Sequence, residues 1–285
     1  MTGESAAVKA EVLVEALPYI QRFRGKVVVI KYGGAAMADP DLAGLFAQDV
    51  VLMRSVGIRP VVVHGGGPQI GRLMRRLGKQ PEFREGLRVT DADTLDIARM
   101  VLVGKVNRDI VSSINVLEPV AVGLSGEDAG LITASARHPD LGFVGDVEAV
   151  NPAILERLLA EDLIPVVATI GTDLGGQAYN INADTAAGAV AEALRAEKLV
   201  YLTDVLGVLR DVADPDSLVT TATADELDTL VEDGILSGGM IPKVGSCARA
   251  VRNGVAHAHI LDGRVRHALL LEMLTPEGVG TMVTA

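Results

Sequence analysis

The sequence has no tryptophan, and aromatic residues make up only 3% of its 285 positions. Since hydrophobic residues still account for 49%, the core must consist of closely packed aliphatic side chains. The single cysteine, Cys247, excludes an internal disulfide. No Cys/His cluster has the spacing of metal ligands, so we predict no metal held by the protein alone.

Long apolar runs and basic residues are also scarce. No run approaches the ~18 apolar residues of a membrane span, and the N-terminus lacks the layout of a signal peptide. Lys and Arg number 26 against 37 Asp and Glu, a net charge of −11. These features predict a cytoplasmic protein with no membrane or nucleic-acid partner. An anionic ligand would need a few Lys, Arg and backbone N–H groups gathered in one cleft.

Short β-branched runs alternate with segments of helical spacing. We predict strands at 26–32, 59–64, 119–124, 163–170, 198–204 and 257–262, and helices at 41–55, 68–77, 94–114, 152–161, 184–196, 242–253 and 265–274. The alternation predicts an α/β fold, a three-layer α-β-α sandwich around a mainly parallel open sheet. The turn-rich stretch 172–180 suggests a boundary between two lobes.

Glycines follow several of these strands, where open α/β sheets bind their ligands. Gly65-Gly66-Gly67 precedes a helix and could hold phosphoryl oxygens through backbone N–H groups, or be only a tight turn. The chain has neither GxxxxGK[ST] nor GxGxxG after its first strand, which disfavours a P-loop or Rossmann dinucleotide site. Lys31, beside Gly33-Gly34, could contact phosphate or extend to solvent.

Three further groups could be functional or structural. In the segment 180–184 (NINAD), two Asn and one Asp are more than a helix cap requires. Lys243 at a helix start opposes the macrodipole unless an anion lies there. Arg88 suits a carboxylate clamp but could be a surface charge. The histidines, including His64, give no signal.

Eight ordered segments resemble the amino acid kinase family, in particular its members that phosphorylate N-acetyl-L-glutamate. They are KYGG (31–34), VVVHGGGPQI (61–70), GLRVT (86–90), LVGKVNRDIV (102–111), AVGLSGEDAGLI (121–132), YNINADTAAGA (179–189), YLTDVLGVL (201–209) and GGMIPKV (238–244). The resemblance implies an N-terminal helix (1–24), an N-lobe for the amino-acid substrate and for dimerisation (25–175), and a C-lobe for ATP and the inhibitor arginine (176–285).

The resemblance also implies roles for individual residues. Those expected at the transferring phosphoryl group are Lys31, Lys243 and Asp184. Those expected to bind acetylglutamate are Gly66, Gly67, Arg88, Asn180 and Asn182. Those expected to bind ATP, which would carry Mg²⁺, are Gly33, Gly34, Thr203, Asp204, Val205 and Gly207. One departure from the close relatives is Ala35-Ala36.

The chemistry implied is ATP-dependent phosphorylation of the γ-carboxylate of N-acetyl-L-glutamate, a step of arginine biosynthesis. Such a carboxylate has a reference pKa near ~4.3 and is already an anion, so no general base is needed. Catalysis must then come from positioning and charge neutralisation.

The resemblance extends to regulation by L-arginine. The expected arginine contacts are Tyr19, Lys198, His259, Glu272 and Gly278. From periodicity alone, the helix near 5–23 would pack on its own domain; the resemblance instead implies that it joins dimers into a hexamer, a trimer of dimers. Docking of a PII-type signalling protein is left open.

Two alternatives remain from the sequence. One is a kinase for acetylated or carrier-linked α-aminoadipate, whose substrate is one methylene longer. The other is a non-catalytic arginine sensor on a kinase scaffold.

Overall fold

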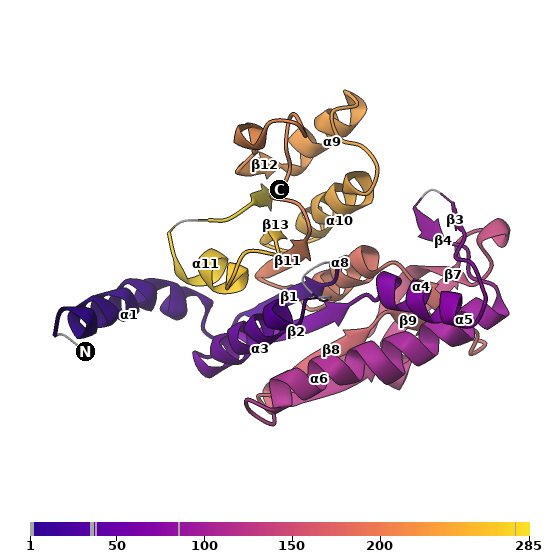
Figure 1. Ribbon diagram of the computed structural model, residues 1–285, viewed down its shortest axis with the longest axis horizontal. Coiled ribbons are helices and arrows are strands. Elements are labelled where there is room, and N and C mark those ends of the chain that lie inside the picture. The colour runs from indigo at the N-terminus through magenta and orange to yellow at the C-terminus, as the bar shows by residue number, and fades with distance from the viewer. Residues whose placement is uncertain (1–2, 35–36, 38, 85, 277) are drawn as a thin grey trace.

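The computed structural model describes residues 3–34, 37, 39–84, 86–276 and 278–285. Its main sheet has eight strands in the order β12-β14-β13-β11-β1-β2-β8-β5 (Figure 1). They are β1 (Val27–Tyr32), β2 (Arg59–His64), β5 (Ala121–Ser125), β8 (Ile164–Ala168), β11 (Lys198–Thr203), β12 (Thr221–Thr223), β13 (His257–Asp262) and β14 (Thr281–Thr284). All neighbours are parallel except β13 and β14.

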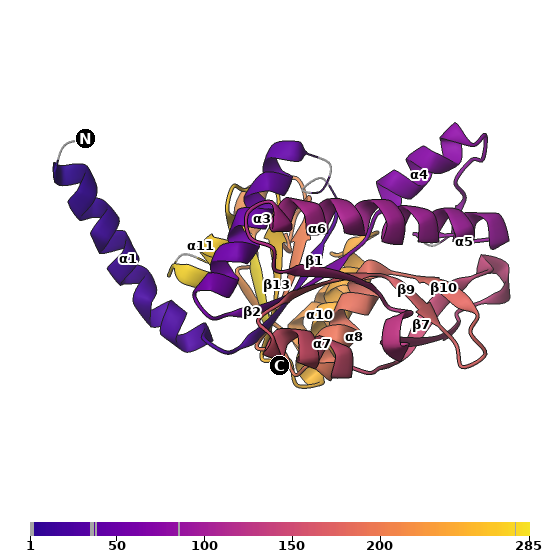
Figure 2. The same cartoon turned by 90° about the horizontal axis from the view of Figure 1, so that it is seen from below.

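Helices cover both faces of this sheet, as Figure 2 shows. One layer contains α3 (Pro40–Ser55), α4 (Gly67–Arg76), α5 (Ala92–Arg99), α6 (Asn107–Asn115) and α11 (Ala268–Leu274). The other contains α7 (Ala153–Ala160), α8 (Ala183–Ala193), α9 (Ala224–Glu232) and α10 (Met240–Arg252). Alternate residues of β1 enter different cores, with Val28 and Ile30 on the first side and Val29 on the second. The predicted three-layer sandwich is confirmed.

A small closed barrel was not predicted. It consists of β6 (Ile132–Ala136), β7 (Val144–Val150), β9 (Ile170–Thr172) and β10 (Ala178–Ile181), and a two-stranded hairpin, β3 (Phe83–Arg84) with β4 (Leu87–Arg88), lies nearby. The strand predicted at 163–170 is confirmed over Ile164–Ala168, but its end is wrong, because β9 begins at Ile170 and joins the barrel. The turn-rich stretch 172–180 contains the turn between β9 and β10.

The helix predicted at 94–114 is not uniformly α-helical. Between α5 and α6 lies a π-helical segment, Met100–Val106. Such wide turns are frequent at functional sites. Here Leu102 lies against the triglycine turn, where a Cβ added to Gly66 would be 2.7 Å from Leu102 Cδ2.

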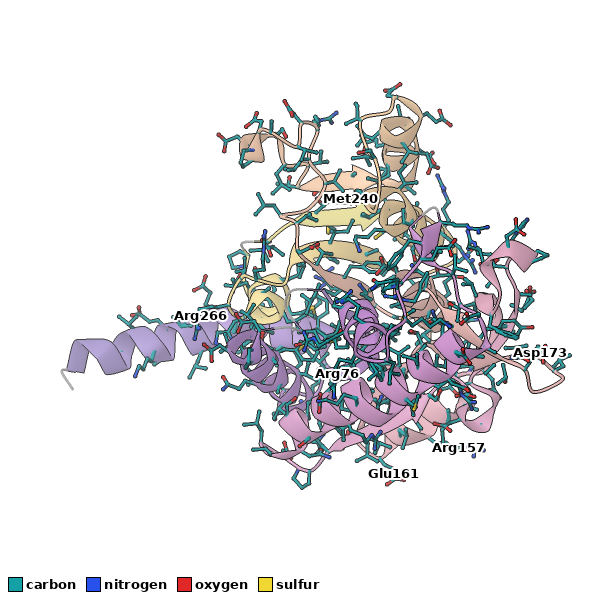
Figure 3. All side chains as sticks on the ribbon, turned by 45° about the vertical axis from the view of Figure 1, so that its right-hand side comes forward. Arg76, Arg157, Glu161, Asp173, Met240 and Arg266 are labelled. Carbon is teal, nitrogen blue, oxygen red and sulfur yellow. The ribbon has the colours of Figure 1, made fainter. Side chains whose placement is uncertain are left out.

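The N-terminal helix α1 (Gly3–Phe23) extends away from the body of the molecule, as Figure 3 shows. Phe23 anchors its last turn and is only 2% exposed, whereas Val12 is 57% and Leu13 72% exposed. Periodicity alone would have packed the whole helix on its own domain, and the structure does not show that arrangement. Among the described residues, no helix combines the length and apolar character needed to cross a membrane.

Candidate active site

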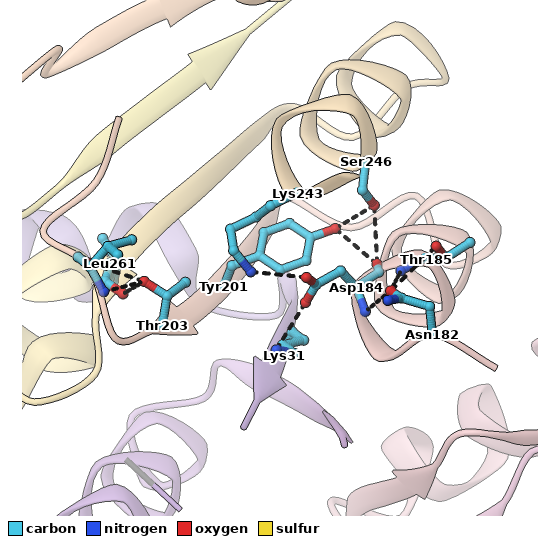
Figure 4. A network of polar contacts seen from close by, with 10 residues as sticks. Lys31, Asn182, Asp184, Thr185, Tyr201, Thr203, Lys243, Ser246 and Leu261 are labelled. Atoms are coloured by element: carbon cyan, nitrogen blue, oxygen red, sulfur yellow. Dashed lines mark hydrogen bonds and ion pairs between the residues drawn. The ribbon is translucent and has the colours of Figure 1, made fainter. Parts of the chain in front are cut away.

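Three charged side chains from three elements meet at the carboxyl end of β1. Strand alternation turns Lys31 to the same side of the sheet as Val29, towards α8. Lys31 Nζ lies 2.9 Å from Asp184 Oδ1, and Lys243 Nζ lies 2.9 Å from Asp184 Oδ2 (Figure 4). One carboxylate therefore holds two ammonium groups side by side.

The charge balance of this cluster suits an anionic ligand. Burial alone would raise the pKa of Asp184, but the charges of Lys31 and Lys243 and their hydrogen bonds lower it. Asp184 is thus ionised at neutral pH. Two cations and one anion leave one net positive charge, in side chains that remain 12–13% exposed.

The start of α8 explains why Asp184 is available for this role. The side-chain oxygen of Asn182 caps the helix by accepting hydrogen bonds from the backbone N–H groups of Asp184 (2.9 Å) and Thr185 (3.1 Å). Since Asn182 satisfies these groups, the carboxylate of Asp184 is free to pair with the lysines. The surplus of polar residues in this segment is accounted for.

Two residues that the sequence did not single out, Tyr201 and Ser246, contact the backbone carbonyl of Asp184. The Tyr201 hydroxyl lies 3.1 Å from the Asp184 carbonyl oxygen and 2.6 Å from Ser246 Oγ, which itself lies 3.0 Å from that carbonyl (Figure 4). Burial raises the pKa of Tyr201, so its hydroxyl remains protonated. The Tyr201 ring also lies 5.6 Å from the Lys243 ammonium.

Beside Lys31, a cavity of about 280 Å³ is bordered by the glycine turns. Among its lining residues are Gly33, Gly34, Gly66, Gly67, Arg88, Asn180 and Asn182. The structure thus brings all the predicted acetylglutamate-binding residues to one cavity. Ala35 and Ala36 lie outside the described residues.

Arg88 is held in place by several contacts at the wall of this cavity. It is only 9% exposed, donates from Nη2 to the Gly67 carbonyl (2.8 Å), and its guanidinium lies 4.7 Å from the Phe83 ring centroid. Asn180, which lines the same cavity, has its Nδ2 3.4 Å from Thr90 Oγ1. A buried guanidinium with remaining N–H donors is suited to bind a carboxylate.

A larger cavity of about 880 Å³ adjoins the first one. Asn182, Gly86 and Leu87 border both, and Asp184, Gly238 and Gly239 line the larger one. Asp184 lines the larger cavity and its partner Lys31 lines the smaller one, so this ion pair lies where the two spaces meet. This is the geometry required to bring two ligands together at one point.

Four predicted ATP-binding residues lie at the carboxyl end of β11, outside both cavities. Thr203 ends β11, and Asp204, Val205 and Gly207 follow it in a turn. Thr203 Oγ1 lies 3.0 Å from the Val205 carbonyl and 3.1 Å from the Val205 N–H, so it shapes the turn. None of the four lines either cavity described above. Their nucleotide role stays a prediction.

The profile described as "Amino acid kinase family" matches residues 26–262. The chain belongs to the amino acid kinase family. It is 57% identical to the acetylglutamate kinase of Symbiobacterium thermophilum, over 98% of this chain and 99% of that protein. It is 52% identical to the acetylglutamate kinase of Synechocystis sp., over 99% and 96% respectively. The resemblance predicted from the motifs is confirmed.

Solved structures agree with this amino acid kinase assignment. An N-acetylglutamate synthase of Neisseria gonorrhoeae, complexed with coenzyme A and N-acetyl-glutamate, superposes with a TM-score of 0.85 at 29% identity, covering 97% of this chain. The present chain spans 63% of that synthase. A carbamate kinase of Giardia lamblia, at 19% identity and a TM-score of 0.68, covers 91% of this chain and 98% of its own, and shares the fold.

This amino acid kinase has a further cavity of about 410 Å³ between α1, α11 and β12. Tyr19, Lys198, Glu272 and Gly278, four of the residues predicted to bind arginine, line it. The fifth, His259, lies behind Glu272, with its Nδ1 2.8 Å from Glu272 Oε1. The structure thus brings together residues that are far apart in the chain.

Glu272 is the electrostatic centre of this cavity. Its Oε1 lies 2.9 Å from Lys198 Nζ. Burial would raise the pKa of Glu272, but the hydrogen bond and charge of His259 and the charge of Lys198 lower it to about 2. Burial in turn lowers the pKa of His259. The cavity therefore presents a buried, ionised carboxylate.

Proposed function

We propose that the chain catalyses the ATP-dependent phosphorylation of the γ-carboxylate of N-acetyl-L-glutamate, which yields N-acetyl-L-glutamyl 5-phosphate in arginine biosynthesis. The observation that carries the proposal is the bridge of Lys31 and Lys243 across Asp184, beside a glycine-walled cavity. The 57% identity to an acetylglutamate kinase over nearly the whole chain supports the substrate.

In the proposed reaction, one oxygen of the γ-carboxylate attacks the terminal phosphorus of ATP and ADP leaves. The nucleophile is already an anion, so the main barrier is its approach to a polyanion. Lys31 and Lys243 would neutralise the transferring group from two sides, and Asp184 would keep both ammonium groups in place. This preorganised charge stabilises the transition state without a proton transfer.

Substrate orientation would come from the walls of the 280 Å³ cavity. Arg88 and Asn180, with Asn182 nearby, would bind the α-carboxylate. The N–H groups of Gly66 and Gly67 are available there, because the first N–H groups of a helix have no intrahelical acceptor. The N-lobe (25–175) would bind most of acetylglutamate, with Asn180 and Asn182 contributed by the C-lobe (176–285). We further propose that the N-lobe carries the dimer contact and that the C-lobe binds ATP.

The donor set fits the phosphates of ATP. Gly33 and Gly34 border one cavity, and Gly238 and Gly239 border the other. Across the described ranges, no group of three or more His, Cys, Asp or Glu side chains could hold a metal. Mg²⁺ would therefore arrive with the phosphates and supply further charge neutralisation.

We also propose that L-arginine binds at Glu272 and inhibits the enzyme. The ionised carboxylate of Glu272 complements a guanidinium. The Nε2 of His259 is buried and has no hydrogen-bond partner among the described residues, so a polar ligand group could engage it. Tyr19 extends the same wall from α1, which would link arginine binding to that helix.

The exposed apolar side chains of α1 support a proposed hexamer. Val12, Leu13 and Val14 are 57%, 72% and 68% exposed on a helix that leaves its own domain. A second copy of α1 is the partner we propose, joining dimers into a trimer of dimers.

The deciding experiment is hydroxylamine trapping of the acyl phosphate with ATP and N-acetyl-L-glutamate, N-acetyl-α-aminoadipate or L-aspartate in parallel. We expect turnover of acetylglutamate alone, lost when EDTA removes Mg²⁺ and suppressed by L-arginine. Turnover of the aminoadipate analogue alone would reassign the substrate. Absence of turnover with every acid would reject the kinase proposal in favour of an arginine sensor.

A further inference from the structure

His64 is a fully buried histidine to which the proposed reaction gives no role. It ends β2 directly before the triglycine turn, and none of its side chain is exposed. Its two ring nitrogens each have one polar contact, to Asn107 Nδ2 (3.1 Å) and to the Gly65 carbonyl (3.0 Å). The direction of these two hydrogen bonds can be derived from their neighbours.

The side-chain amide of Asn107 has only one chemically consistent orientation. Its Oδ1 accepts a hydrogen bond from the guanidinium of Arg108, which can only donate. Its Nδ2 lies 2.8 Å from the Val166 carbonyl and 3.3 Å from the Leu124 carbonyl, which can only accept. Exchanging O and N would set an oxygen against two carbonyls and an NH₂ against a guanidinium. Asn107 Nδ2 has two N–H bonds and does not accept. The Val166 carbonyl and His64 Nε2 (3.1 Å) lie closer to it than the Leu124 carbonyl does, so Asn107 Nδ2 is a donor towards His64.

A donor on one side of the imidazole determines the proton on the other. His64 Nε2 must accept from Asn107, so the neutral ring carries its proton on Nδ1. That proton is donated to the Gly65 carbonyl. Burial is the main reason why the pKa of His64 is lowered to about 4, so the ring stays neutral at physiological pH.

The Gly65 carbonyl belongs to the same planar peptide as the Gly66 N–H. In a trans peptide these two groups point to opposite sides, so fixing one fixes the other. Gly66 lines the 280 Å³ cavity with Lys31 and Arg88. Glycine has no side chain to hold this peptide in one orientation, so the hold must come from outside the turn.

We propose that His64, locked in its Nδ1–H tautomer by Asn107 and Arg108, is a positioning residue that orients the Gly65–Gly66 peptide so that the Gly66 N–H donates to the phosphoryl group or the attacking carboxylate. This proposal rests on the proposed kinase reaction. The series of hydrogen bonds runs from Arg108 on α6 to Asn107, His64 and Gly65, and none of the first three lines either ligand cavity.

A substitution at Gly123 on β5 gives a second way to disturb the same series of hydrogen bonds. A Cβ added there would overlap the Arg108 guanidinium and Asn107 Oδ1. Gly123→Ala must therefore displace the group that fixes the Asn107 amide, although Gly123 borders neither ligand cavity.

The first test compares His64→Leu, which lacks the donor, with His64→Asn, whose Nδ2 can replace Nδ1–H. Removing an oxyanion donor costs about 10²–10³ in kcat, and loosening one should cost about tenfold. We expect His64→Leu and Gly123→Ala to lower kcat for acetylglutamate at least about tenfold. We expect KM to change less than kcat, and His64→Asn to recover much of the loss. A His64→Leu enzyme within twofold of the wild-type kcat would overturn the proposal.

The matched control is Asn115→Leu. Asn115 also lies on α6 and bonds backbone groups, donating to the Ala121 carbonyl (3.1 Å) and accepting from the Ala121 N–H (2.7 Å), but it lies outside both ligand cavities. It should lower stability and leave kcat unchanged. If it lowers kcat as much as His64→Leu does, the effect is a general weakening of α6 and the positioning role is wrong.

A second test, by NMR spectroscopy, does not depend on enzymatic activity. In ¹⁵N-histidine-labelled wild-type protein, His64 should show a protonated Nδ1 and an unprotonated Nε2, unchanged from pH 6 to 8. Assignment comes from the loss of that signal in His64→Leu or His64→Asn. A proton on Nε2 would reject the hydrogen-bond chain even in an active enzyme. If His64 has the expected tautomer but the protein turns over none of the acids, the kinase proposal is rejected, and with it the positioning role of His64 in the reaction.

Discussion

Lys31 Nζ lies 2.9 Å from Asp184 Oδ1, and this contact ties the central strand of the sheet to the first turn of α8. The other oxygen of the same carboxylate holds Lys243 from α10. Each lysine is therefore held in position by Asp184, which lies on a different element, α8. Removing one lysine should leave the other one paired.

Lys243→Ala is expected to abolish turnover without unfolding the protein. Lys31 remains to neutralise Asp184, so no buried charge is left alone, while half of the positive charge at the phosphoryl group is lost. We expect kcat to fall by about 10³ or more in the hydroxylamine assay. Arg252→Ala on the same helix, which removes exposed ion pairs to Asp225 and Asp228, should change kcat less than twofold. Near-normal turnover in Lys243→Ala would remove this lysine from the mechanism.

Arg88→Lys should separate binding from chemistry. A lysine keeps the charge but cannot bond Gly67 and a carboxylate with one planar fork. We expect KM for acetylglutamate to rise about tenfold or more, with KM for ATP unchanged. Arg84→Lys, in the same hairpin but exposed, is the control. An unchanged KM in Arg88→Lys would show that this guanidinium does not hold the substrate.

Leu13→Glu is expected to reduce the size of the assembly. A charge on the exposed apolar side of α1 cannot be buried between two helices without a partner. Size-exclusion chromatography with light scattering should give the mass of a hexamer for the wild type and of a dimer for Leu13→Glu. Glu15→Gln on the same helix should leave the hexamer intact. A wild-type protein that is already a dimer would contradict the proposed role of α1.

Glu272→Gln should weaken arginine inhibition. The substitution keeps the size of the side chain and removes the charge that would attract the guanidinium, while acetylglutamate turnover occurs elsewhere. We expect the inhibitory arginine concentration to rise at least about tenfold, with kcat in the absence of arginine unchanged. Glu197→Gln, which breaks the partly exposed pair with Lys26, is the control. Equal sensitivity of Glu272→Gln and wild type would place arginine elsewhere.

The same variant tests the ionisation of Glu272 through stability. Its pKa of about 2 in the folded protein lies below the ordinary value of 4.5, so ionised Glu272 stabilises the fold above about pH 4.5. That contribution is lost as the pH falls from 4.5 towards 2, and it amounts to roughly 3 kcal/mol at most. Urea unfolding should show a gap between wild type and Glu272→Gln at pH 7 that narrows by pH 3. A gap that stays constant would mean that Glu272 is not held as an anion.

Much of the fold could be predicted because the buried strands are continuous apolar runs. The predicted strands 59–64 and 257–262 match β2 and β13 to the residue. The barrel escaped prediction because its strands are mixed in polarity, as in Thr133 and Ser135 of β6, so they give no clear pattern. Thr169 breaks one apolar run into strands of two different sheets, which depends on tertiary packing alone.

The candidate site shows the same division. Lys31 and Lys243 could be singled out because they lie beside glycine turns, and Asp184 because its segment has more polar residues than a helix cap requires. Their roles were implied by the family resemblance. His64 and Tyr201 could not, since the role of each depends on partners from other elements, Asn107 and Ser246. The sequence does not determine which ring nitrogen of a histidine carries the proton; the contacts in the fold do.

The position of Lys198 and Tyr201 on one strand has a consequence for the proposed inhibition by arginine. Lys198 begins β11 at the proposed arginine cavity, and Tyr201 follows in the same strand with its hydroxyl on the Asp184 carbonyl. At ~3.3 Å per residue, their Cα atoms are about 10 Å apart along the strand axis. Both side chains are buried. A shift of β11 along its axis would therefore move Lys198 at the proposed arginine cavity together with the Tyr201 hydroxyl that contacts Asp184. Communication between effector and reaction would then need neither a hinge nor an unfolding step, only the stiffness of a single extended segment.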